Sequence, residues 1–134
     1  MDPLSQTPNL RLRLTVPESA RVGSIVPFVI RLENVGETNL ELYLRGRTIA
    51  YDILIRNEPG AVVWNRLHGE IIPGIIQVKV LDPGETLELS HEWHQRTNRG
   101  ETVVPGLYSA QGIVPTDGPE PLASAPTQFL IVPE

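Results

Sequence analysis

Polar side chains with catalytic potential gather in one short run, His91-Glu92-Trp93-His94, with Ser90 just before it. Two histidines joined by a third ligand could hold zinc. The run belongs to a segment that alternates polar and apolar residues, as a strand does. Residues three apart on a strand point to opposite faces, so His91 and His94 reach one ion only if the strand is bulged. We therefore predict no metal site, with His91 at the rim of the core and His94 at the start of a loop.

Other catalytic arrangements are also missing from this sequence. Ser90 and His91 are adjacent on the predicted strand and face apart, and no G-x-S-x-G elbow is present. Glu88 and Glu92 share the outward face of the same strand, which is typical of a solvated row. No glycine-rich phosphate loop precedes a helix. The sequence predicts a non-catalytic protein without a cofactor.

Two long polar stretches are the candidate contact elements. Long loops on a rigid scaffold often carry function. The first runs from Gln95 to Pro105 and the second from Leu67 to Gly74. The candidate contact residues are Arg96, Thr97, Asn98 and Arg99 in the first loop, and His68, Glu70 and Ile71 in the second. For each loop, an ordinary connection between strands stays open as the alternative.

The elements that would position these loops all show a hydrophobic period of two, the signature of half-buried strands. The apolar rows run over 10–16, 26–32, 40–44, 49–55, 76–80, 87–93, 107–114 and 128–132, and Val62 and Trp64 share a face between them. Turn signals such as Glu58-Pro59-Gly60 separate the rows. No segment shows a helical period. We predict an all-β, immunoglobulin-like antiparallel β-sandwich of about eight or nine strands, with a flexible segment at 1–8 and a single domain at 9–134.

Three aromatic residues bear on this architecture. Tyr108 follows Pro105-Gly106 at the start of a late strand, the position of a tyrosine corner in immunoglobulin-like sandwiches. The alternative is a half-buried strand aromatic. Trp64 and Trp93 both lie on the same strand face as the alternating apolar residues around them, which favours core packing. Surface recognition is the alternative.

Composition narrows the classes of partner. The net charge of −5 argues against nucleic acid and against an anionic membrane surface. The chain has no cysteine and no apolar run of membrane-spanning length. The first ten residues show no signal-peptide pattern. We expect a cytoplasmic protein, although a secreted or periplasmic fragment without its leader would look the same.

Several short motifs resemble one family. They are Val63-Trp64, the run from Leu81 to Glu85, Trp93 and Gly106-Leu107-Tyr108, supported upstream by 30–34 and 40–53. Over about residues 25–114 the chain resembles the BsuPI-type intracellular proteinase inhibitors. The resemblance implies an immunoglobulin-like sandwich that inhibits intracellular serine proteases. The family pattern usually has an aromatic residue and a Gln after the first Trp, where this chain has Gly69-Glu70-Ile71-Ile72.

Two functions remain in view. An inhibitor would place a loop in a protease cleft, where Arg96 or Arg99 suits a trypsin-like pocket and Leu67 or Ile71 a subtilisin-like one. An interaction or assembly module without inhibitory activity would instead pair an edge strand with a partner strand. In both cases the partner is a protein, and a serine protease is the first candidate.

Overall fold

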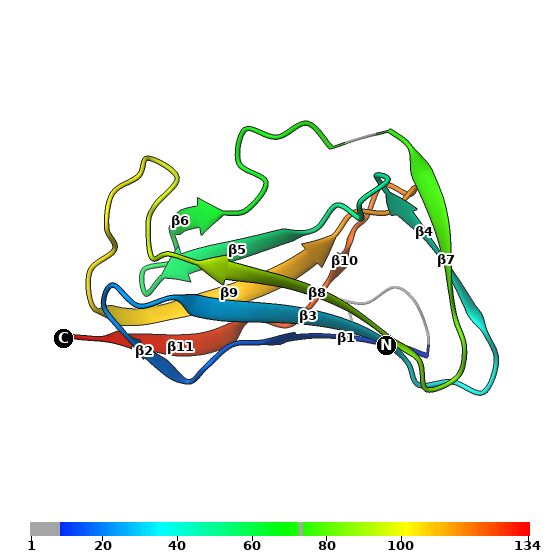
Figure 1. The fold of residues 1–134 in the computed structure, drawn as a ribbon, viewed down its shortest axis with the longest axis horizontal. Helices are drawn as coiled ribbons and strands as arrows, with labels where there is room; N and C mark the ends of the chain where they lie inside the picture. The colour runs from blue at the N-terminus through cyan, green and yellow to red at the C-terminus, as the bar shows by residue number, and fades with distance from the viewer. Residues whose placement is uncertain (1–8, 73) are drawn as a thin grey trace.

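The structure is a computed structural model that describes residues 9–72 and 74–134, and the described residues form strands and turns only (Figure 1). The predicted flexible segment 1–8 lies outside the described residues. The strands are β1 (Leu10–Thr15), β2 (Ser19–Arg21), β3 (Val26–Asn34), β4 (Leu40–Arg45), β5 (Asp52–Asn57), β6 (Val62–Asn65), β7 (Ile76–Leu81), β8 (Thr86–Trp93), β9 (Gly106–Val114), β10 (Leu122–Ala123) and β11 (Thr127–Val132). The described part contains no helix that could cross a membrane.

Two sheets enclose the core. One has the order β1-β3-β8 and the other β2-β11-β9-β5-β6, with β10 added at β9. All of these pairs are antiparallel except β2 with β11. A third, two-stranded sheet joins β4 to β7. The all-β, immunoglobulin-like prediction is confirmed. The structure adds β2 and β10, whose three and two residues are too short to show a hydrophobic period.

The alternating rows build the core as expected. In β3 the side chains of Val26, Phe28, Ile30 and Leu32 are fully buried. Aromatic rings fill the space between the sheets, with Phe28 and Phe129 meeting edge to face at 5.8 Å between centroids. Trp93 is buried as predicted, whereas Trp64 is half-buried at the margin of the core.

One apolar row faces solvent and not the core. The strand predicted around 76–80 is β7, but Ile76, Val78 and Val80 point outward and are 38%, 51% and 45% exposed. The inward parity carries Gln77, Lys79 and the buried Leu81. A hydrophobic period of two distinguishes the two faces of a strand, but it does not show which of the two faces is covered by the rest of the protein.

The start of β9 carries a tyrosine corner. The hydroxyl of Tyr108 donates a hydrogen bond to the carbonyl of Val104 at 2.6 Å, which confirms the corner. Burial raises the pKa of this phenol above its ordinary value. The bond fixes the end of the preceding loop, which is the first of the two candidate contact loops.

Candidate functional site

The loop between β8 and β9 is held at its base by Gln95. This side chain is fully buried, and its backbone has a φ of 59°, in the left-handed region. Its Nε2 donates to the carbonyls of Arg21 and Ser24 at 2.7 and 2.9 Å, and its Oε1 accepts from the amide of Gly23 at 3.1 Å. The base of the loop is thereby joined to the turn between β2 and β3, more than seventy residues away in sequence.

Both arms of the loop are anchored to the core. The indole Nε1 of Trp93 donates to the carbonyl of Arg96 at 3.0 Å. On the returning arm, Val103 is buried and its amide donates to the carbonyl of Gln95 at 3.1 Å. The sequence predicts a long polar loop here, and the structure shows a compact loop tied to the sandwich on both sides.

The tip of the loop is closed by its own hydrogen bonds. The amide of Thr97 donates to the carbonyl of Glu101 at 2.7 Å, and the amide of Gly100 donates to the carbonyl of Thr97 at 2.9 Å. The hydroxyl of Thr97 accepts from the amides of Arg99 and Glu101, each at 3.2 Å. Gly100 adopts a φ of +86°, which glycine reaches without a steric penalty.

Asn98 fastens the tip to the neighbouring strand β6. Its Oδ1 accepts from the amide of Asn65 at 2.9 Å, and its Nδ2 donates to the carbonyl of Asn65 at 3.0 Å. The backbone amide of Asn98 donates to the carbonyl of Val63 at 3.3 Å. The side chain therefore occupies the place that a pairing strand would take at this edge.

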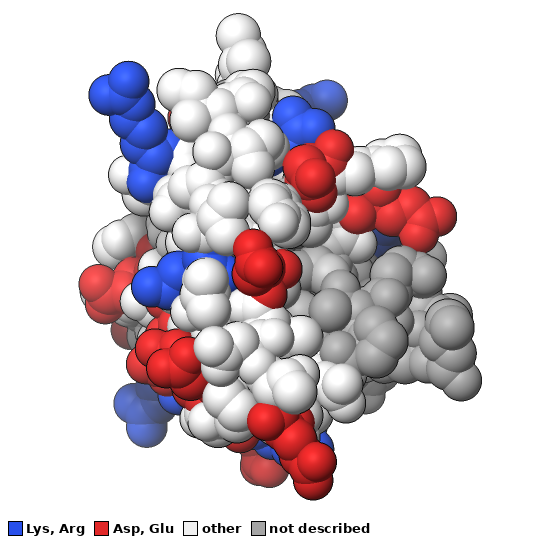
Figure 2. All heavy atoms as spheres, turned by 90° about the vertical axis from the view of Figure 1, so that its right-hand side faces the viewer, with Lys and Arg blue, Asp and Glu red and all other residues white. Residues whose placement is uncertain are grey.

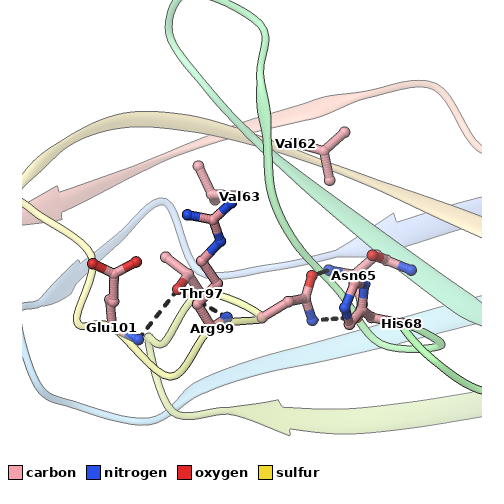
Figure 3. A pocket seen from close by; sticks show the side chains of 8 residues that line it. Val62, Val63, Asn65, His68, Thr97, Arg99 and Glu101 are labelled. Atoms are coloured by element: carbon pink, nitrogen blue, oxygen red, sulfur yellow. Dashed lines mark hydrogen bonds between the residues drawn. The ribbon is translucent and has the colours of Figure 1, made fainter.

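A cavity of about 490 Å³ opens between this loop and β6. Its lining residues are Val62, Val63, Asn65, His68, Thr97, Asn98, Arg99 and Glu101. In Figure 3, Thr97, Arg99 and Glu101 lie beside one another, and Asn65 and His68 lie at the other end. Residues from both predicted contact loops thus meet around one hollow.

The predicted contact residues separate into groups. Thr97, Asn98, Arg99 and His68 line the shared cavity. Arg96 does not line it; this side chain is exposed, and its Nη1 donates to the carbonyl of Gly100 at 3.0 Å. Glu70 lines a different hollow, with Arg45 and Asp52. Ile71 projects into solvent with 91% of its surface exposed.

Two residues of this site were missed as site residues by sequence reasoning. Asn65 supplies the backbone groups that Asn98 binds, and Gln95 holds the base of the loop. Both depend on contacts between distant segments, and neither carries a local sequence signal. Within the described residues, His, Asp and Glu side chains form no group of three or more that could hold a metal ion.

Comparison with known proteins assigns the family. The family model described as BsuPI, intracellular proteinase inhibitor, matches residues 12–118, which is most of the chain. This chain belongs to the BsuPI family. The resemblance expected from the short sequence motifs is therefore confirmed. Among curated proteins, no relative matches.

Solved structures extend the likeness of fold beyond the BsuPI family. The Pseudomonas fluorescens alkylpurine DNA glycosylase AlkC, bound to DNA with an abasic site analog, is 16% identical with a TM-score of 0.51, and the match covers 92% of this chain and 30% of that one. The CARDB domain of the PF1109 protein from Pyrococcus furiosus is 13% identical with a TM-score of 0.49, covering 93% and 94%. A β-glucosidase from Listeria innocua is 12% identical with a TM-score of 0.46, covering 91% and 16%. This chain spans less than a third of the glycosylase and of the glucosidase, and the likeness concerns the fold alone.

Proposed function

We propose that this BsuPI-family chain is a non-catalytic inhibitor of a trypsin-like serine protease, and that the loop between β8 and β9 enters the protease with Arg99 at its tip. The observation that carries the proposal is the bracing of this loop. It is held by Gln95 at the base, by Trp93 along one arm, by the Tyr108 corner at its end and by Asn98 at the tip. The description of the family as intracellular supports a cytoplasmic location.

Bracing matters because it removes an entropic penalty from binding. A loop that is already ordered loses little conformational freedom when a protease closes around it. Interface backbones in protease–inhibitor complexes accordingly move little on binding. If the protease cleaves a bond in a braced loop, the two new chain ends stay held beside each other, which favours rejoining of the bond over release of a product. Such a loop can block a cleft without being turned over.

Arg99 suits the recognition role better than Arg96. Arg99 is exposed at the tip, and within the described residues its guanidinium has no hydrogen-bond or ion-pair partner. The guanidinium of Arg96 is already bound to the carbonyl of Gly100. Trypsin-like proteases select their substrates with a carboxylate in the primary specificity pocket. A free guanidinium on a rigid tip is the complementary group.

The test is a titration of residual activity of a trypsin-like protease against the wild-type chain, Arg99→Ala and Arg47→Ala. Arg47 is a matched control because it is exposed and lies in the turn directly after β4, a strand that lies at the end of the sandwich away from this loop (Figure 1). We expect stoichiometric inhibition by the wild type and by Arg47→Ala. Arg99→Ala should bind roughly 30-fold more weakly or worse, the effect of losing an interface hot spot of about 2 kcal/mol. Equal inhibition by all three chains would remove Arg99 from the interface.

A subtilisin-like target is the second candidate, because Ile71 offers a large apolar side chain that is 91% exposed in the other loop. The same titration with a subtilisin-like protease and the Ile71→Ser variant tests it. If Ile71→Ser alone loses inhibition of the subtilisin-like protease, the second loop is the one that contacts that protease. Full activity of both proteases at large molar excess would leave the interaction module without inhibitory activity as the function.

A further inference from the structure

In the part of the chain that the structure describes, the outer edge of β7 has no strand beside it. Within the described residues β7 pairs only with β4. The amide of Gly46 donates to the carbonyl of Ile75 at 2.7 Å, so Ile75 directs its backbone groups toward the β4 side. Backbone direction alternates along an antiparallel ladder. Gln77 and Lys79 therefore also bond toward β4, and the N–H and C=O groups of Ile76, Val78 and Val80 point outward.

A second contact supports this assignment of which backbone groups point toward β4 and which point outward. Tyr43 lies opposite Val78 in the ladder, and its carbonyl accepts from the amide of Asp117 at 3.2 Å on the far side of β4. The backbone groups of Tyr43 thus point away from β7, as those of Val78 point away from β4. The free edge of β7 offers three donors and three acceptors, one of each from Ile76, Val78 and Val80.

The same strand has an apolar outer face. Among the described residues, five of the twelve exposed large hydrophobic side chains lie on β7, directly before it, or opposite it on β4: Tyr43, Ile75, Ile76, Val78 and Val80. Figure 2 views this side of the molecule and shows uncharged side chains over much of it, with charged ones between and around them. An open strand edge under an exposed apolar row is a template for strand pairing.

We propose that β7 pairs antiparallel with β7 of a second copy of this chain, about a two-fold axis through Val78, to form a continuous sheet in the order β4-β7-β7-β4. In this register Val78 lies opposite Val78 of the second copy, and Ile76 lies opposite Val80. All three outward-pointing residues then exchange both backbone hydrogen bonds with the second copy. An isologous contact of this kind closes as a dimer and does not extend into a fibre.

The side chains are self-complementary in this register. On the outer face, Ile76, Val78 and Val80 of both copies form one apolar band, flanked by the Tyr43 side chain of each copy. On the inner face, Lys79 lies opposite Gln77 of the second copy, so no like charges face each other. Moving the axis by one residue to Lys79 would set the two ammonium groups directly opposite, which is destabilising, and would pair fewer of the free backbone groups.

The dimer would leave the β8–β9 loop open. That loop lies at one end of the sandwich and β7 lies at the other (Figure 1). The proposal goes beyond the inhibitory function and does not depend on it, because the two surfaces have no residue in common.

Sedimentation equilibrium over a dilution series tests the dimer, with the full chain, Val78→Lys, Val78→Pro and the control Leu130→Lys. We expect a dimer for the wild type. Val78→Lys places two charges face to face at the axis, and Val78→Pro removes an outward N–H without touching the bonds to β4. Both should sediment as monomers. Leu130 is 41% exposed on β11, which is paired on both sides, so the same added charge there should leave the dimer intact.

Hydrogen exchange adds a readout of the pairing itself. In the wild-type dimer the amides of Ile76, Val78 and Val80 should exchange slowly, and at least tenfold faster in Val78→Lys. Circular dichroism establishes that the variants are folded. A monomeric wild type throughout the series would overturn the proposal, as would a dimer that survives both Val78 variants or leaves these three amides exchanging fast. A strand of another protein found on β7 of a monomeric chain would likewise overturn it.

Discussion

The side chain of His91 links the strand β8 to the margin of the core. Its ring stacks on Trp64 with 5.5 Å between centroids and an interplanar angle of 21°. Burial lowers the pKa of His91 below its ordinary value of 6.5, and the nearby Arg66 and His94 lower it further, whereas Glu92 acts in the opposite direction. In the folded protein the neutral imidazole is therefore favoured, as suits a packing residue.

This lowered pKa makes the folding stability depend on pH in a defined window. Near pH 6.5 the unfolded chain binds more protons at His91 than the folded chain does, because the folded pKa is lowered. The contribution of His91 to folding stability is therefore fully present above about pH 6.5. The free energy of unfolding falls as the pH drops from there toward the lowered pKa of the folded state. Urea denaturation at about pH 7.5 and about pH 5 should show this decrease in the wild type. His91→Phe should reduce it, and His68→Phe, at an exposed position, should not. An unchanged decrease in His91→Phe would assign the effect to other groups.

The loop between β8 and β9 takes its shape from contacts with other elements. The clamp between Asn98 and Asn65 spans thirty-three residues, and the Gln95 anchor spans more than seventy. Sequence reasoning located this loop, because polar residues interrupt the alternating strands on both sides. It did not predict the clamp, because hydrogen bonds between distant segments leave no periodicity. Similarly, alternation predicted β7 as a strand, whereas the 51% exposure of Val78 is a property of the assembled sheets.

The clamp predicts a coupled loss of stability and inhibition. Asn98→Ala removes two side-chain hydrogen bonds and leaves the backbone groups of Asn65 without these partners, so unfolding should become easier by about 1–3 kcal/mol. Urea denaturation measures this loss. The loop tip should then exchange its amides faster, and protease inhibition should weaken. Thr116→Ala is the control, because Thr116 bonds Gly118 and Glu120 within a different loop. If both variants inhibit equally well, the clamp does not position the tip.

At the scale of the whole molecule, the spacing between the two main sheets depends on one glycine. Gly112 in β9 faces Ile30 in β3, and a Cβ added at Gly112 would lie 2.9 Å from Cγ1 and 3.0 Å from Cδ1 of that isoleucine. Ile30 is itself fully buried and has little room to move. The sheets approach so closely here that the glycine is needed for space, since its φ is not in the left-handed region.

This contact can be tested with a double-mutant cycle measured by urea denaturation. Gly112→Ala should overpack the core and lower the free energy of unfolding by about 1–3 kcal/mol. Ile30→Val removes Cδ1 and alone should lower it by about 0.5–1.5 kcal/mol. In the double variant the added methyl group takes up part of the space that Cδ1 leaves, so the combined loss should be smaller than the sum of the two. Gly74→Ala, where an added Cβ meets no atom within 4 Å, should have little effect. Strict additivity would mean that the sheets move apart to admit the methyl group, and that their spacing is set by the remaining core side chains.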